Sequence, residues 1–296
     1  MRSVIAGCVL MFVVVAAAGQ TKPEETLSFT SPRPIRDAIV DFEKKYGWVI
    51  TYEEPRFQFS GDMEDLAQSA RLQGKSIAPD KQFRVPKSRT VSVTYQRPTN
   101  PANPTSRLQV VQTILDAYAH GEGDTFEIRE TASRLHIVPG LVRNTSGQLQ
   151  HQAPVFDAVI SITDDSRDGL QFLEDFCEQL SSAVGIKVVT GTVPTNALAR
   201  YQTKRGFASL SARDALEQFL DGMPNGARYS WRLLYGDLPP SGLSYVLNIN
   251  WVPDRTAPPV SASQTPNHPK IERPGVRILM PADASGSSGP ANTAPK

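Results

Sequence analysis

Apolar residues recur every three to four positions in four segments of the chain, and this spacing predicts amphipathic helices. The segments lie near 34–46, over 106–119, near 166–184 and over 211–222. Gly47 follows the first segment and Gly185 follows the third, and glycine accommodates the left-handed backbone at which many helices end. The pattern therefore predicts four helices, two of which end at a glycine.

Residues that can satisfy free backbone N–H groups stand near the expected helix starts. Ser106 and Gln109 have the spacing of a capping box for the second helix, and Ser211 stands at the start of the fourth. The acidic pair Asp164 and Asp165 is expected to cap the third helix and to complement its dipole.

Alternating apolar and polar residues between the helices predict β-strands. Both helix-stopping glycines lead into apolar segments, and two later pairs of segments flank turns, which indicates hairpins. The strand candidates are 48–53, 90–96, 125–130, 134–138, 186–191, 228–235 and 243–252. Small sheets expose edge strands, and "TVSVTYQ" (90–96) and "KRGFASL" (204–210) are the candidate edges at which a partner strand can pair.

One helix and the strand after it occur twice. "SRLQVVQTILDAYAHGEGDTFEIRE" (106–130) aligns without a gap to "SARDALEQFLDGMPNGARYSWRLLY" (211–235). Each half of the chain then reads strand, helix, strand, followed by strand, helix, hairpin. Because the apolar stripe of each helix must be covered by a sheet, we predict an α/β fold of the α+β type. It has two small modules, each of two βαβ-like units with helices packed on small mixed sheets.

The remaining segments set the expected domain boundaries. Module one contains a long polar insertion at 53–89, with weak helical character near 63–72, and such a loop is either functional or disordered. A tail rich in Pro, Ser and Ala has the composition of a disordered segment. Whether the modules pack together is left open. We expect a signal peptide at 1–19, module one at 20–139, a linker at 140–154, module two at 155–253 and a disordered tail at 254–296.

The N-terminus has the pattern of an export signal. Arg2 precedes an apolar run from Val4 to Ala18, and cleavage is expected before Gln20. The alternatives are an uncleaved membrane anchor, for which the run is short, and a lipoprotein signal at "VIAGC", whose cysteine precedes most of the run. Cleavage leaves Cys177 as the one cysteine, so no internal disulfide forms. We expect a bacterial protein, periplasmic or otherwise exported, without a membrane span in the mature chain.

Composition and motifs give no chemical signature. With 40% hydrophobic residues and a net charge of +1, the chain has no nucleic-acid footprint. Cys177 lies on the apolar stripe of the third helix, where a free cysteine packs as a small hydrophobe. His136 alternates with apolar neighbours, which places it on the polar face of a strand. We expect no catalytic, cofactor-binding or metal residues, because no metal motif includes the four histidines, His120, His136, His151 and His268.

The order of elements resembles the short N-terminal domain of secretins and TonB-dependent receptors. "YGWVITYEEP" in module one and "VGIKVVTG" in module two are similar to that domain's passage from helix through glycine into a strand. "VVQTILDAYAHGEGDTFEIRETASRLHIVP" is similar to its second helix and closing hairpin. The resemblance covers 27–139 and, more loosely, 155–253. It implies a small α/β domain that binds other envelope proteins and has no catalytic residues.

Three hypotheses about function follow. The first is an exported, non-enzymatic protein-binding module, accessory to a secretin, pilus or TonB-type system. The second is a structural assembly subunit of a secretion apparatus. The third is an envelope hydrolase with a site near the 53–89 insertion. The departures from the family, which are that insertion and the lack of a pore domain in this sequence, favour an accessory role. The partner and the oligomeric state are left open.

Overall fold

The computed structural model describes residues 23–255, except 79–81, 123, 132 and 239–241. The predicted signal peptide at 1–19 and all but two residues of the predicted tail at 254–296 lie outside the described residues. Among the helices within that range, none has the length and apolar character needed to cross a membrane.

Both halves of the chain have the same order of elements. The first half forms β1 (Glu24–Ser31), α1 (Pro34–Tyr46), β2 (Ile50–Glu53), β5 (Arg89–Gln96), α3 (Pro104–Glu122), β6 (Phe126–Glu130) and β7 (Leu135–Pro139). The second half forms β10 (Val159–Ile162), α4 (Gly169–Val184), β12 (Val188–Thr190), β14 (Phe207–Ser211), α6 (Ala212–Asp221), β15 (Tyr229–Leu238) and β16 (Gly242–Trp251).

The strands also pair in the same way in both halves. β1 is antiparallel to β5, as β10 is to β14. β2 is parallel to β7, which is antiparallel to β6, and β12, β16 and β15 repeat this arrangement. The predicted duplication is therefore a duplication of topology, and each first-half element has a named equivalent in the second.

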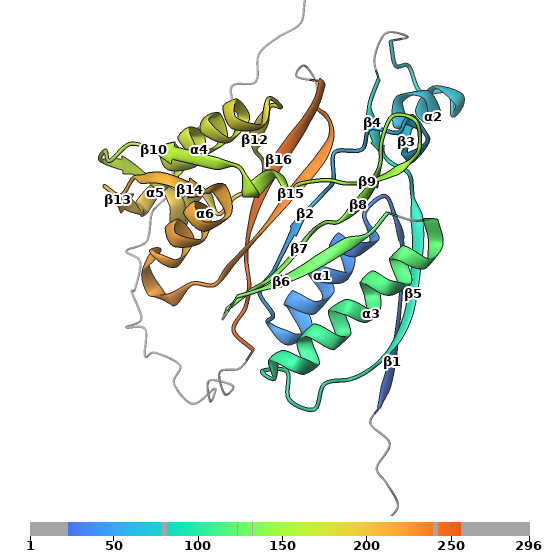
Figure 1. Cartoon of the computed structure of the whole chain (residues 1–296), viewed down its shortest axis with the longest axis horizontal. Helices are drawn as coiled ribbons and strands as arrows, with labels where there is room; N and C mark the ends of the chain where they lie inside the picture. The colour runs from blue at the N-terminus through green and yellow to red at the C-terminus, as the bar shows by residue number, and fades with distance from the viewer. Residues whose placement is uncertain (1–22, 79–81, 123, 132, 239–241, 256–296) are drawn as a thin grey trace, which may run out of the picture. The chain divides into compact units, whose positions relative to one another are not determined.

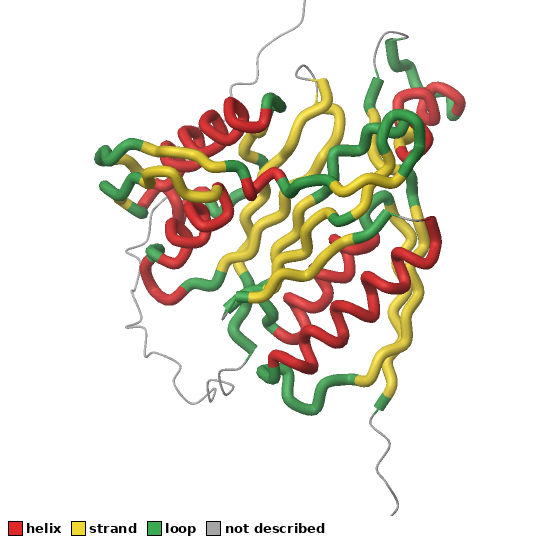
Figure 2. Tube along the Cα trace, in the orientation of Figure 1, coloured by secondary structure: helices red, strands yellow, loops and turns green. Residues whose placement is uncertain are grey.

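A single sheet joins the two halves. Among the described residues, six strands follow the order β12-β16-β15-β2-β7-β6. The joint is the parallel pairing of β15 with β2, where Arg232 lies opposite Tyr52 and Leu233 opposite Glu53. Figure 2 shows these strands running through the centre of the fold. The predicted mixed α/β fold is confirmed, and the two modules share a sheet.

The two pairs of helices cover opposite faces of this sheet. Neighbouring residues in paired strands point to the same face, so Arg232 and Leu234 share a face with Tyr52. Tyr52 and Leu234 pack in the core of α1 and α3, whereas Trp231 belongs to the core of α4 and α6. Figure 1 accordingly shows α1 and α3 on one side of the central strands and α4 and α6 on the other.

The helix ends agree with the sequence in part. Gly47 and Gly185 both have φ of +67°, which confirms the predicted glycine stops. The Oγ of Ser211 accepts the N–H of Asp214 at 3.0 Å, which confirms it as the cap of α6. The predicted capping box of Ser106 and Gln109 is wrong.

That helix begins two residues before Ser106, at Pro104, and the N–H of Thr105 bonds to Asn103 at 2.9 Å. The prediction that Asp164 and Asp165 cap α4 is also wrong. The cap is Asp168, which forms a capping box with Gln171. Asp164 instead accepts the N–H of Gly206 at 2.6 Å, because it lies beside the end of β10.

The segments between the repeated elements also fold. The predicted insertion at 53–89 contains the helix α2 (Leu66–Leu72), which lies within the segment 63–72 that was predicted to have helical character. Arg84 in this segment reaches Asp237 of β15 at 3.1 Å. The predicted linker at 140–154 holds a hairpin whose Val142 is buried. These segments include η1 (Ser60–Asp62), β3 (Met63–Asp65), α2 (Leu66–Leu72), β4 (Arg84–Pro86), β8 (Leu141–Arg143) and β9 (Leu149–His151).

Short elements complete the second half. They are η2 (Val155–Asp157), β11 (Arg167–Asp168), α5 (Thr195–Arg200), β13 (Gln202–Thr203) and η3 (Pro224–Gly226). β11 pairs with β13 in a short antiparallel ladder, and α5 packs on α4. α5 lies between β12 and β14, as α2 lies between β2 and β5 in the first half.

Buried ion pairs flank the joint between β2 and β15. Glu53, at the end of β2, is 1% exposed; it lies 3.1 Å from Arg213 of α6 and accepts the N–H of Val155. On the other face, Glu43 of α1 pairs with Arg232 of β15. A buried carboxylate is costly unless it is paired, so these contacts hold the halves in one register.

We predict that Arg213→Ala lowers the free energy of unfolding by about 3–5 kcal/mol, because it leaves the carboxylate of Glu53 buried without a cation. Urea denaturation at a pH of about 8, where Glu53 is ionised, measures the change. Arg200→Ala on the surface of α5 is the control, and its effect should stay within about 0.5 kcal/mol. Equal effects of the two substitutions would contradict a structural role for the pair.

Candidate functional site

Three side chains at the joint have the order of a hydrolytic triad. The hydroxyl of Thr51 lies 2.8 Å from Nδ1 of His136, and Nε2 of His136 lies 2.9 Å from Oε1 of Glu217 on α6. Triads also place a base between a nucleophile and an orienting acid, although the nucleophile there faces Nε2 and the acid Nδ1. Thr51 and His136 are each 1% exposed, however, so a substrate cannot reach the hydroxyl. This chain of contacts joins β2 and β7 to α6.

His136 was predicted to lie on the polar face of a strand, and the structure buries that face. Its neighbours along β7 alternate as expected, but the second half covers the face toward which His136 points. The ring of Trp231 is 5.6 Å away, and Arg134 and Glu217 lie 4.0 Å apart on the same side. A pattern of alternation identifies the two faces of a strand, but it does not reveal that both are buried.

The other sequence candidates show no reactive arrangement. Cys177 is buried in the second core, as predicted, and burial raises the pKa of its thiol to about 11, with the hydroxyl of Thr190 opposing. His151 is exposed and lies 3.5 Å from Glu127, and His268 is outside the described residues. Over residues 23–255, gaps excepted, no three His, Cys, Asp or Glu side chains are placed to share a metal ion.

Burial shifts the carboxyl groups at the joint. Desolvation raises the pKa of Glu53 to about 7, and the charge of Arg213 opposes this shift. Desolvation likewise raises the pKa of Glu43 to about 7 against the charge of Arg232. The pKa of Glu54 is also raised by burial, although it pairs with Arg33 at 2.7 Å. All three groups therefore hold protons at pH values where exposed carboxyls have lost them.

The sheet ends at two strands that pair on one side within the described residues, β6 and β12. The N–H of Tyr245 bonds to the carbonyl of Lys187, and the N–H of Gly191 bonds to the carbonyl of Leu247. Because successive residues of a strand direct their backbone groups to opposite sides, those of Val188 and Thr190 point away from β16. The N–H of Val188 is already bonded to Oγ of Ser181 at 2.8 Å.

A groove runs beside β12 along α4. It encloses a cavity of about 490 Å³, lined by Cys177, Ser181 and residues 187–190. In the first half, the place equivalent to this groove, beside β2 and against α1, is filled by β15. Of the two predicted edge segments, 90–96 lies in β5 and 204–210 contains the start of β14. Within the described residues, each of these strands pairs with one other strand.

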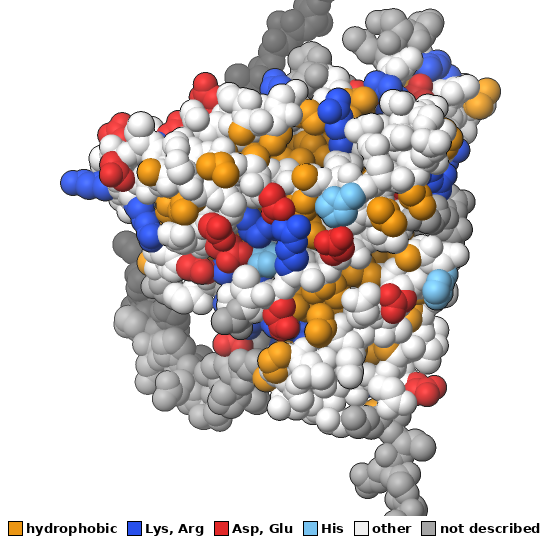
Figure 3. All heavy atoms as spheres, in the orientation of Figure 1, with side chains coloured by type: hydrophobic (Ala, Val, Ile, Leu, Met, Phe, Trp, Pro, Cys, Tyr) orange, Lys and Arg blue, Asp and Glu red, His pale blue; other side chains and the backbone are white. Residues whose placement is uncertain are grey.

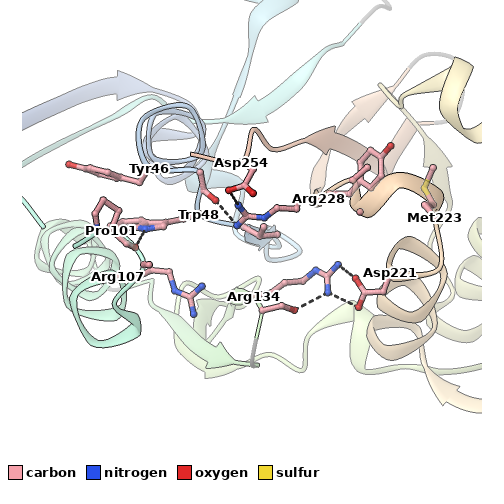
Figure 4. A pocket seen from close by; sticks show the side chains of 16 residues that line it. Tyr46, Trp48, Pro101, Arg107, Arg134, Asp221, Met223, Arg228 and Asp254 are labelled. Atoms are coloured by element: carbon pink, nitrogen blue, oxygen red, sulfur yellow. Dashed lines mark hydrogen bonds and ion pairs between the residues drawn. The ribbon is translucent and has the colours of Figure 1, made fainter. Parts of the chain in front are cut away.

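A second cavity lies where both halves meet at one end of the sheet (Figure 4). Its volume is about 590 Å³. Arg134 forms a forked pair with Asp221, one arm of which is 3.0 Å long. Arg228 donates to the carbonyl of Gly47 at 2.7 Å. Arg107 extends from α3 toward the turn that carries Arg134 (Figure 4).

Charged groups also gather outside this cavity. Figure 3 shows side chains of both signs in the region between α6 and β6. Arg129 of β6 and Asp157 of η2 are 2.7 Å apart there, and Asp157 also lies 3.1 Å from Arg213. Because each cation has a nearby carboxylate, this region has no large excess of one sign.

Sequence reasoning named none of the three arginines that line this second cavity, which is called the arginine cavity below. Arg107 lies in α3, Arg134 in the turn between β6 and β7, and Arg228 just before β15. Their separation along the chain gives no local motif, and Arg107 aligns with Ala212 in the repeat. Only the pairing of β2 with β15, which the sequence pattern leaves open, brings the three together.

No protein-family model, curated protein or solved structure matches this chain. The resemblance to the short N-terminal domain of secretins and TonB-dependent receptors therefore stays a prediction from the sequence.

We predict that the protein becomes less stable as the pH rises from about 4.5 to about 7. In this window Glu43 and Glu53 keep their protons in the folded chain but have released them in the unfolded chain. Their contribution to the free energy of unfolding is therefore complete below pH 4.5 and is lost as the pH rises through about 7. Each carboxyl should contribute roughly 1–3 kcal/mol. Urea denaturation across this range measures the slope, and Glu53→Gln should make it shallower. An unchanged slope in that variant would contradict the assignment.

Proposed function

We propose that this protein is an exported, non-enzymatic protein-binding module of the bacterial envelope, accessory to a secretin, pilus or TonB-type system. The observation that carries the proposal is the open groove between β12 and α4, whose equivalent in the first half receives β15. The signal pattern of 1–19 supports export, and the resemblance of 27–139 supports an envelope partner. The burial of Thr51 and His136 supports a role without catalysis.

The binding mode is the addition of a partner strand to β12. The partner strand lies in the groove and bonds to the outward N–H and carbonyl of Thr190. Ser181 already satisfies the N–H of Val188, so the pairing begins at Thr190 and is short. The joint between β15 and β2 is equally short, with two residue pairs. Side chains on the α4 side of the partner strand meet Cys177 and Val188, which favours apolar residues there.

We predict that Thr190→Pro abolishes capture of the envelope partner in a crosslinking pull-down from the native host, read by mass spectrometry. Proline removes the outward N–H but leaves the ladder with β16 intact, because the bonds to β16 come from Lys187 and Gly191. Thr190→Val is the matched control, since it keeps the N–H, and it should capture the partner as the natural chain does. Equal recovery with Thr190→Pro in a folded state would exclude strand addition at β12.

A second candidate function is a structural assembly subunit. The observation that favours it is the equivalence of β6 with β15 and of β12 with β2. β6 of one copy can therefore pair with β12 of the next as β15 pairs with β2 inside the chain. Such a contact is heterologous, so it joins copies head to tail into a ring or an open chain. The equivalent register places Glu127 of one copy opposite Thr190 of another.

For this candidate we predict that Glu127→Cys mixed with Thr190→Cys gives a disulfide-linked heterodimer on mild oxidation, because paired strands hold Cα atoms within disulfide range. All variants carry Cys177→Ala, because Sγ of Cys177 lies 3.6 Å from the hydroxyl of Thr190 and would compete for a cysteine there. Glu127→Cys mixed with Ser182→Cys, on the exposed side of α4, is the control out of register and should give little product. Gel electrophoresis without reductant measures the yield. Equal yields from both mixtures, or a monomer at all concentrations in light scattering, would contradict self-assembly.

A further inference from the structure

Two arginines that line the cavity between the two halves have a buried Nε without a hydrogen-bond partner among the described residues. Arg134 is 4% exposed, and its Nε has no hydrogen-bond partner among the described residues. The Nε of Arg107 is also buried and has no hydrogen-bond partner among the described residues. Buried donors of charged groups are almost always bonded, so an unused donor in a cavity wall indicates an acceptor that binds there.

Arg107 is the one of the three arginines whose paired carboxylate does not line the cavity. Arg134 has the forked contact with Asp221, and Arg228 lies 3.4 Å from Asp254, so both have a carboxylate inside the cavity. The carboxylate nearest to Arg107 belongs to Glu130 of β6, which is not part of the lining and accepts one bond of 3.0 Å. A guanidinium has five N–H donors, so most of those of Arg107 remain for a ligand.

The wall beside this cation contains a tryptophan that is held in place. Trp48 stacks on Tyr46 with ring centroids 4.5 Å apart, and its Nε1 donates to the carbonyl of Pro101 at 2.7 Å. Trp48 lies over the space into which Arg107 extends (Figure 4). Met223 and Tyr229 add apolar surface on the side of the second half. The volume of about 590 Å³ is in the range of small-ligand sites and accommodates one or two residues of a peptide.

We propose that this cavity binds the carboxylate of a peptide, with Arg107 as the principal contact and the ring of Trp48 as the apolar wall beside it. The planar fork of arginine matches the two oxygens of a carboxylate. The carboxylate comes from an acidic side chain or from a peptide C-terminus, which offer the same chemistry. The site is separate from the groove at β12 and does not depend on strand addition.

Calorimetric titration of the full chain with three hexapeptides tests the proposal. The first contains two aspartates and ends in an amide, the second contains asparagines and a free C-terminus, and the third contains asparagines and an amide. Binding of the first identifies a side-chain carboxylate, and binding of the second a terminal one. Absence of binding by both, or equal binding of the third, overturns the proposal.

Substitutions locate the site. Arg107→Gln should weaken binding by at least about tenfold, and Arg107→Lys, which keeps the charge but not the fork, should have an intermediate effect. Arg200→Gln on α5 is the matched control and should bind as the natural chain does. Unchanged affinity in Arg107→Gln overturns the site. Thr190→Pro should bind the peptide normally, so failure of strand capture alone leaves this site standing.

Discussion

The fold depends on the pairing of β2 with β15. This short parallel contact turns two three-stranded units into one sheet, and it brings Glu53, Glu43 and their arginines into the interior. A carboxylate there is stable only while its partner is present, so the ion pairs fix the register that the short ladder alone defines weakly. The arginine cavity and the contact of His136 with Glu217 follow from the same register.

Sequence patterns predicted the elements well and their assembly poorly. The glycine stops at Gly47 and Gly185, the apolar stripes and the duplicated helix and strand are local properties, and periodicity records them directly. The predicted start of α3 was wrong because Asn103, like Ser106, can accept a backbone N–H at a helix start. Several polar residue types can do this, so the sequence does not show which of two neighbouring candidates caps the helix. The burial of His136 was missed because alternation cannot show that the second half covers the polar face of β7.

The candidate sites were beyond local reasoning for a related reason. Both segments predicted as edges contain strands, but the open groove lies at β12, which the sequence predicted as a strand (186–191) and not as an edge. The groove beside β12 is open because β15 pairs with β2, which leaves β12 at the edge of the sheet. Arg107 and Arg134 lie at unremarkable surface-like positions in the sequence, and only burial by a distant segment makes their donors informative. Polar residues at a joint between repeats escape any pattern built on one repeat.

The hydroxyl of Ser181 has a consequence for how long such a sheet can become. Counted from the glycine that ends each first helix, Ser181 occupies the position of Glu43, which reaches across to the neighbouring strand. Glu43 pairs with Arg232 of the neighbouring strand β15, whereas the shorter Ser181 bonds to Val188 of β12 in its own half. The sheet therefore gains an ion pair to the next strand beside α1 but not beside α4. A further strand beside α4 would have to be held by backbone hydrogen bonds and apolar contacts alone.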